Sequence, residues 1–241
     1  LLYFKFMSPN QIHIPYVDDL LVIWHDTPGA HALKQINHFD IAILLLCSHA
    51  IHIDKTEHWF ETKFLKKFYS RLFDSSFSND ALQFVRLNLT RELAVFKLCT
   101  EISEVSTEKV RIQLLFYFFD LAVSDGKLHN EELKFIEAIK DSFQISNKQY
   151  QSIFSLYAMY NKNFRREALK SSDNNLNLAL KVFGLTATSN LEQVKKKYKQ
   201  LVKLHHPDKV THLGKIHYDR ATKMIKEINK AYSYIEKHFN I

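Results

Sequence analysis

Residues 191–209 read LEQVKKKYKQLVKLHHPDK, and residues 225–232 read IKEINKAY. At about 100° per residue, four bulky side chains of the first stretch fall within about 80° of one another, and three lysines fall on the opposite side. This pattern predicts an amphipathic helix with one packed face and one positively charged face. The bulky residues are Leu191, Val194, Tyr198 and Leu201, and the lysines are Lys196, Lys199 and Lys203.

The tripeptide His206-Pro207-Asp208 must end this helix. Proline lacks an N–H donor and pushes the residue before it out of the α region. Apolar residues then recur at three- and four-residue spacing from about residue 219, which predicts a helix that lies antiparallel to the first. A shorter helix with Leu180 and Phe183 on one face is expected upstream, stopping at Gly184. The recurring residues are Met224, Ile225, Ile228, Ala231, Tyr232 and Ile235.

Helix breakers are scarce along the whole chain of 241 residues. Only four glycines and four prolines occur, and three of the prolines, Pro9, Pro15 and Pro28, lie near the start. Apolar residues make up 46% of the chain, enough for one sizeable core or two modest ones. The composition therefore predicts an all-α protein.

Positive charge is confined to the C-terminal part of the chain. The range 174–241 holds 13 Lys and Arg against 5 Asp and Glu, a net +8, whereas the range 1–173 holds 20 against 21, a net −1. The polar string SSDNN at 171–175 precedes the basic segment and predicts a linker. We therefore expect an N-terminal segment of unclear structure over 1–36, a helical bundle over 37–170, the linker at 171–175, and a second domain over 176–241.

Helical spacing of apolar residues predicts the helices of the bundle at 39–50, 55–73, 79–103, 108–124, 130–143 and 147–169. When the chain is aligned with itself without gaps, an earlier helix pair matches a later one, so that Cys47 aligns with Ala122 and Glu57 with Glu132. Such a repeat indicates a duplicated helix pair that builds one bundle. The range 16–24 fits a short strand or a helix equally well.

The C-terminal segment closely resembles the J domain over residues 176–235. The family pattern Ile-Lys-x-x-Tyr-Arg-x-Leu, then four residues, then His-Pro-Asp-Lys, is similar to residues 194–209. The later Phe-Lys-Glu-Ile-Asn-x-Ala-Tyr is similar to residues 225–232. Departures retain packing or charge: Leu180 stands where Tyr is usual, Phe183 where Leu is, Lys199 for Arg, and Ile225 for Phe.

The bundle resembles TerB-like domains through residues 122–128, AVSDGKL, followed by Glu132. A TerB-like bundle followed by a J domain is similar to DjlA-type proteins, which add a membrane anchor. The resemblance implies an all-α fold, with the bundle followed by the antiparallel helical hairpin of the J domain. Under this interpretation, the bundle selects the client protein or the location, and the client itself is unknown.

The J-domain resemblance implies a co-chaperone that docks on a DnaK-type chaperone of the heat-shock 70 class and stimulates its ATP hydrolysis. The lysine face would steer the domain onto an acidic patch of that partner. His206, Pro207 and Asp208 would then engage the partner's domain junction, and no catalytic residue or cofactor is expected in this chain. The J-domain core is expected to contain Leu180, Phe183, Val194, Tyr198, Leu201, Ile228, Ala231 and Tyr232.

Cysteine content and hydropathy indicate the compartment. Cys47 and Cys99 lie in apolar runs without metal-ligand spacing, which predicts buried core thiols in a reducing, cytoplasmic environment. Two cysteines exclude four-cysteine zinc modules. The longest apolar run, residues 41–50, is about half of a bilayer span, so membrane association is expected only through a segment outside this chain.

Two functions of other classes are alternatives. The bundle could be a metal- or stress-responsive binding protein with the J segment as an accessory. However, turn and cap chemistry explains Asp125, Glu131 and Glu132, and His49, His52 and His58 lack a known metal-binding arrangement. The +8 segment could bind nucleic acid, but its aromatic residues are expected on packing faces, so no stacking platform and no nucleic-acid partner are predicted.

Overall fold

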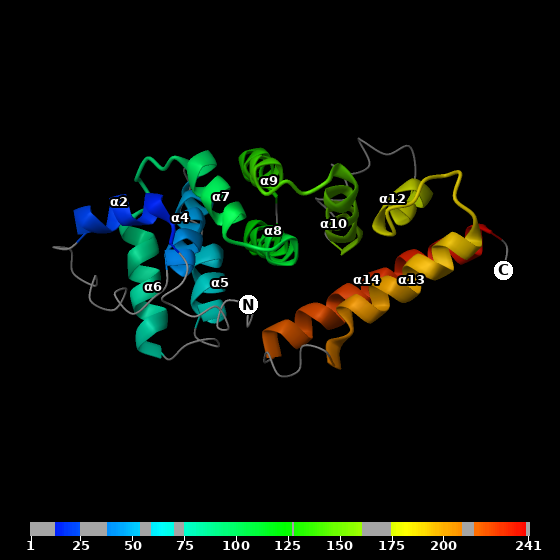
Figure 1. The fold of residues 1–241 in the computed structure, drawn as a ribbon. Helices are drawn as coiled ribbons and strands as arrows, with labels where there is room; N and C mark the ends of the chain where they lie inside the picture. Colours follow the sequence, from blue (N-terminus) through cyan, green and yellow to red (C-terminus); the bar gives the residue numbers. More distant parts are fainter. Residues whose placement is uncertain are drawn as a thin grey trace. The chain divides into compact units, whose positions relative to one another are not determined.

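A computed structural model describes residues 13–24, 38–53, 59–69, 75–126, 128–160, 175–208 and 215–239. Within these ranges the chain forms eleven helices and no strand, so the all-α prediction is confirmed (Figure 1). By packing, the chain divides into two units, Leu1–Ile145 and Ser146–Ile241. The helices of the first unit are α2 (Pro15–Trp24), α4 (His38–His52), α5 (Trp59–Tyr69), α6 (Ser75–Leu87), α7 (Val95–Glu104), α8 (Glu108–Ala122) and α9 (Asn130–Ser142).

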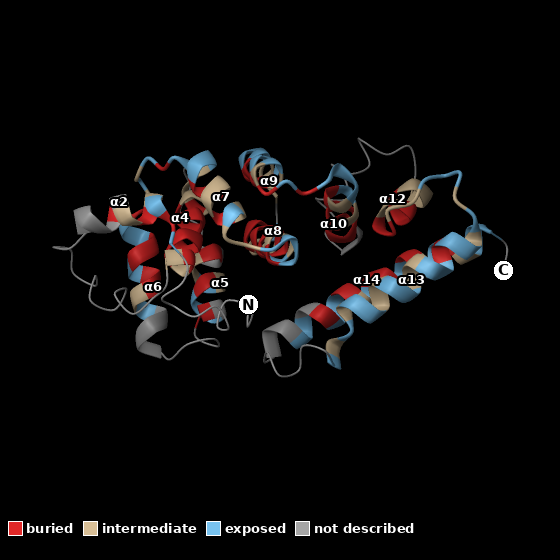
Figure 2. Cartoon of the chain, viewed as in Figure 1, coloured by how far each residue is buried: buried red, intermediate tan, exposed pale blue. Residues whose placement is uncertain are grey.

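The centre of the first unit is formed by α4 and α8. Both helices are apolar around most of their circumference, which is typical of helices with neighbours on several sides. Helix α4 packs on α2, α6, α7 and α8, while α8 packs on α4, α5 and α9. Figure 2 shows the buried residues concentrated on these two helices.

Both cysteines lie in this core, as predicted. Cys47 and Cys99 are free thiols, and neither side chain reaches solvent. The Cys47 Sγ atom lies 3.5 Å from the Tyr117 hydroxyl, which links α4 to α8. Burial raises the pKa of each thiol to about 12, so both remain protonated and unreactive.

The single helix predicted over 79–103 is wrong, because the structure contains two helices there. Helix α6 ends at Leu87 and α7 begins at Val95. The side-chain amide of buried Asn88 donates to the Phe84 carbonyl at 2.7 Å, and the Arg91 N–H donates to the Asn88 carbonyl at 3.1 Å. Asparagine ends the helix here because its side chain competes for backbone groups and favours a turn.

The residues that fitted a strand or a helix form helix α2. Pro15 is its first residue, where the missing N–H costs nothing. The Tyr16 N–H donates to the Glu101 carboxylate at 2.8 Å, and the Tyr16 hydroxyl accepts from the Ala94 N–H at 2.9 Å. These bonds attach α2 to α7. The remainder of the segment predicted as unclear, residues 1–12 and 25–36, lies outside the described residues.

A buried carboxylate pair lies where α5 meets the α8–α9 turn. Glu61 and Glu132 are only 3% and 4% exposed, and their carboxyl groups are hydrogen-bonded to each other. Burial raises the pKa of Glu132 from 4.5 to about 7. The His129 N–H donates to Glu132 at 2.7 Å and favours the ionised form, while the charge on Asp125 favours the protonated form. The hydrogen bond with Glu61 also favours the ionised form, but burial outweighs these effects, so Glu132 binds a proton more tightly in the folded chain than in the unfolded chain.

The proton on Glu132 makes the first unit sensitive to pH. A pKa raised from 4.5 to about 7 on folding adds stability that is complete below about pH 4.5 and is lost as the pH rises through 7. In the wild type, the free energy of unfolding should fall between about pH 5 and about pH 8. We expect this decrease to be smaller in Glu132→Gln. Urea titrations followed by tryptophan fluorescence measure this, because both tryptophans, Trp24 and Trp59, lie in the first unit.

The matched control is Glu131→Gln, since Glu131 is the exposed neighbour on α9. In that variant, the free energy of unfolding should depend on pH as it does in the wild type. An unchanged pH dependence in Glu132→Gln would contradict the raised pKa of Glu132.

Candidate functional site

The second unit contains α10 (Asn147–Tyr160), α12 (Asn175–Val182), α13 (Leu191–His205) and α14 (Lys215–His238). A reciprocal cap starts α13: the Asn190 side chain accepts from the Gln193 N–H, and the Gln193 side chain accepts from the Asn190 N–H, both at 3.0 Å. This capping box satisfies two backbone donors and defines where the basic helix begins.

Helices α13 and α14 lie side by side as an antiparallel hairpin (Figure 1). Val194, Ile228 and Ala231 are fully buried in the unit. The rings of Tyr198 and Tyr232 stack with centroids 4.1 Å apart and planes inclined by 19°, and the Tyr198 hydroxyl donates to the Asn229 amide oxygen at 3.0 Å. These contacts fix the register of the two helices.

The His-Pro-Asp tripeptide lies where α13 stops. His206 has φ −60° and ψ 129°, the extended conformation that a following proline enforces, and Pro207 and Asp208 continue in a short 3₁₀ turn. The Asp208 N–H donates to His206 Nδ1 at 3.3 Å, and the Asp208 carboxylate lies 3.5 Å from the same nitrogen. The His206 and Asp208 side chains are 47% and 81% exposed, so both face solvent.

The three lysines predicted to face away from the core do so. Lys196, Lys199 and Lys203 are exposed on α13. They create a positive surface on the helix that leads into the His-Pro-Asp turn. Lys209, the fourth residue of the sequence motif, lies outside the described residues.

The predicted core residues divide into buried and half-buried groups. Leu180 and Phe183, which depart from the usual family residues, are 1% and 3% exposed, so both side chains fill the core. Tyr198, Leu201 and Tyr232 are half-buried at the edge of the hairpin. Partial burial and the nearby Glu236 carboxylate raise the pKa of Tyr232, so its phenol is neutral at physiological pH.

Helix α10 packs on α12 and α14, so the unit has a helix upstream of the predicted second domain. The Ser152 hydroxyl donates to the Val182 carbonyl at 2.6 Å and satisfies one of the open acceptors at the end of α12. Ile153 and Tyr157 of α10 are buried. Of the linker predicted at 171–175, only Asn175 is described, and it begins α12. The end of the predicted helix, residues 161–169, also lies outside the described part.

Three features of the hairpin differ from expectation. Helix α14 begins at Lys215 rather than near 219. The prediction that aromatic residues lie only on packing faces is wrong, because Tyr218 and Tyr234 are each 43% exposed. Leu204, two residues before His206, is 61% exposed and was not identified from the sequence. Leu204 is an apolar residue outside the apolar stripe of α13, and this is the sequence signal that could have identified it as exposed.

The candidate metal ligands that the structure describes do not come together in one site. Among the described residues, no group of three or more His, Cys, Asp or Glu side chains could hold a metal ion. Asp125 lies 3.8 Å from His129 Nε2, and Glu132 caps α9. Glu131 and Lys134 of α9 are exposed. His58 lies outside the described residues.

Comparison with known families matches both parts of the chain. Residues 40–154 match the family described as Tellurite resistance protein TerB, and residues 180–238 match the DnaJ domain. The chain combines a TerB domain with a DnaJ domain. The DnaJ match includes α13, the His-Pro-Asp turn and α14, whereas the TerB match ends within α10.

A co-chaperone is similar to part of this chain. The chain is 29% identical over 123 residues to a protein named Co-chaperone protein DjlA from Coxiella burnetii, over 48% of this chain and 45% of the relative. The match therefore spans about half the length of that relative. No solved structure matches the chain significantly. In the described residues, no helix is long and apolar enough to cross a membrane.

The hydrogen bond between α10 and α12 predicts that α10 supports the DnaJ domain. In the full chain, Ser152→Ala should speed hydrogen exchange of the α12 amides about fivefold, because one hydrogen bond contributes about 1 kcal/mol to local stability. Hydrogen exchange read by mass spectrometry over residues 175–182 measures the effect.

Ser142→Ala is the matched control, since the Ser142 hydroxyl donates to the Ala138 carbonyl within its own helix. That change should leave exchange in α12 as in the wild type. If Ser152→Ala also leaves α12 unaffected, α10 does not support the helix.

Proposed function

We propose that this protein is a co-chaperone that docks on a DnaK-type chaperone and stimulates its ATP hydrolysis. One observation carries the proposal: within the segment that matches the DnaJ domain, the His-Pro-Asp turn projects into solvent beside a helix face of exposed lysines. The co-chaperone name of the Coxiella burnetii relative supports the same role. ATP hydrolysis would occur in the partner, so this chain needs no catalytic residue.

The docking step follows from charge. Lys196, Lys199 and Lys203 would attract an acidic surface of the chaperone over a range of about 10 Å, the screening length at moderate salt. Such steering mainly accelerates association and selects orientation. Leu204, exposed at the end of the same helix, would add apolar contact area once the two proteins meet.

The stimulation step would depend on the turn itself. Pro207 restricts the backbone, and the contacts between His206 and Asp208 hold the turn in one conformation before the partner arrives. The exposed Asp208 carboxylate can then accept hydrogen bonds from cationic or N–H donors of the chaperone. The turn would favour the hydrolysing state only by binding that state more tightly than the other.

The TerB domain would supply the selectivity of the protein, by choosing its client or its location. We place this activity in the cytoplasm, because two buried free thiols fit a reducing compartment.

Asp208→Asn should abolish stimulation of ATP turnover while leaving the fold intact, because it removes the acceptor charge from an exposed side chain. Steady-state ATP hydrolysis by a DnaK-type chaperone, titrated with the full chain, measures this. Asp219→Asn, an exposed aspartate on α14, is the control and should stimulate like the wild type. Stimulation that survives Asp208→Asn would defeat the proposal.

Changing Lys196 and Lys199 together to Glu should raise the concentration needed for half-maximal stimulation by about tenfold at low salt, because the attraction to the chaperone is reversed. The difference from the wild type should narrow as salt is added. Lys223 and Lys226, exposed on α14, changed together to Glu, provide a control with the same change in net charge. Equal loss in both double variants would show that only the overall charge matters.

A further inference from the structure

A groove of about 530 Å³ runs between α5 and α6 in the TerB domain. Its walls are built from one face of each helix, since the α6 residues lie at positions i, i+3, i+4 and i+7. Leu82 forms an apolar floor and is only 9% exposed. The wall residues are Thr62, Lys63 and Lys66 of α5, and Asn79, Gln83 and Arg86 of α6.

The charge on this surface is positive although the range 1–173 as a whole carries a net −1. Glu61, the one acidic residue of α5, is turned into the interior and is 3% exposed. The exposed charges of α5 are therefore the lysines at positions 63, 66 and 67. Arg86 adds a guanidinium from the facing helix, so cations stand on both walls.

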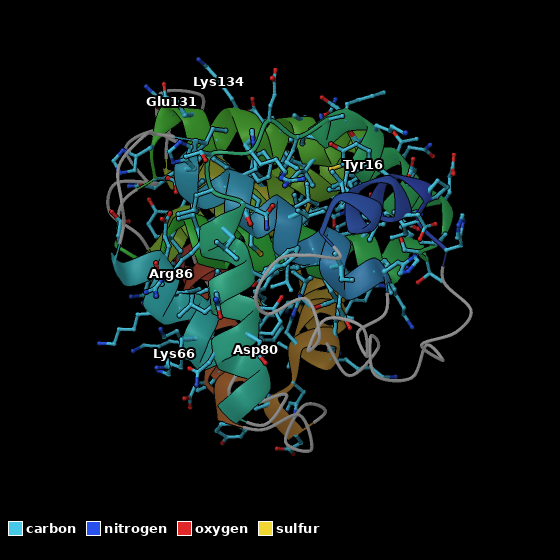
Figure 3. The ribbon with its side chains drawn as sticks, turned by 90° about the vertical axis from the view of Figure 1, so that its left-hand side faces the viewer. Tyr16, Lys66, Asp80, Arg86, Glu131 and Lys134 are labelled. Carbon is cyan, nitrogen blue, oxygen red and sulfur yellow. The ribbon has the colours of Figure 1, made fainter. Side chains whose placement is uncertain are left out.

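Lys66 and Arg86 project from the same side of the domain in Figure 3, whereas Glu131 and Lys134 of α9 lie on another. No ion pair joins Lys66 or Arg86 to an acidic side chain within the described ranges. Asp80 belongs to α6 but does not line the groove. Two cationic side chains that pair with no acidic side chain of the described residues flank an apolar floor, an arrangement that suits an anionic ligand with an apolar centre.

We propose that this groove binds an extended acidic peptide segment, with two carboxylates flanking an apolar residue. The carboxylates would pair with Lys66 and Arg86, and Arg86 can bind a carboxylate through two parallel hydrogen bonds. The apolar residue would rest on Leu82. The α6 wall, from Asn79 to Arg86, is about 10 Å long, which matches about three extended residues.

The side-chain amides favour a peptide over a phosphate-bearing ligand. Asn79 and Gln83 each present an N–H₂ donor and a carbonyl acceptor, and a peptide backbone offers the complementary acceptor and donor. A phosphate at neutral pH mainly accepts hydrogen bonds, so the two amide carbonyls would gain no partner from it. Binding at this groove does not depend on the proposed action of the DnaJ domain, so either can fail without the other.

The test uses the full chain and a fluorescently labelled synthetic peptide with a central Asp-Leu-Asp. Fluorescence anisotropy should show saturable binding that weakens with salt, and a peptide with Lys-Leu-Lys should not bind. Changing Lys66 and Arg86 together to Glu should weaken binding at least about tenfold, the loss expected when two charge-assisted contacts become repulsive. Gln83→Ala should weaken the peptide complex to a smaller extent.

The matched control changes Lys109 and Lys134 together to Glu, because both are exposed in the same unit and the change in net charge is identical. Circular dichroism confirms that each variant keeps its helices. The proposal is overturned if the wild type does not bind the acidic peptide, or if the control loses as much affinity as the groove variant. It is also overturned if equimolar inorganic phosphate displaces the peptide, because the groove would then bind anions without recognising a peptide.

Discussion

The pairing of α13 with α14 is the contact on which the candidate site depends. The stacked rings of Tyr198 and Tyr232, and the bond from the Tyr198 hydroxyl to Asn229, hold the two helices at one register. Because Pro207 ends α13 in the connection between the helices, the His-Pro-Asp turn lies at the tip of the hairpin. A stiff pair of helices thus presents a short acidic turn to solvent, and the lysines of α13 stand on the outer side of the same hairpin.

This hairpin does not bury enough apolar surface by itself. Val194 is the one residue of α13 that is fully buried in the described unit, whereas Leu201 and Tyr198 are half-exposed. Each fully buried aliphatic side chain contributes roughly 1.5–3 kcal/mol, so α13 with one such residue gains little, and the buried face of α14, which includes Met224 and Ile235, needs further partners. Helices α12 and α10 supply the missing contacts, through Leu180 and Phe183 on one and Ile153 and Tyr157 on the other. Helix α10 therefore belongs structurally to the unit that carries the turn, although the TerB match extends into it.

The TerB domain is packed in a different way. Its two central helices, α4 and α8, are apolar on most sides, and the surrounding helices supply the charged surface. Burial of Glu61 beside Glu132 removes its carboxylate from the outer face of α5. The inward position of Glu61 therefore leaves lysines as the exposed charges of α5 along the groove.

The sequence alone determined the helical fold class, the amphipathic basic helix, the turn at Pro207 and the two family resemblances. These features are local, because helical spacing, capping by Asn190 and the effect of proline on its predecessor act within a few residues. Tertiary structure decided what depends on partners distant in the chain: the break at Asn88, the attachment of α10 to α12, the exposure of Leu204 and Tyr218, and the pairing of Glu61 with Glu132. Those outcomes depend on which surfaces meet in three dimensions, and helical periodicity gives the direction of a side chain but not its neighbour.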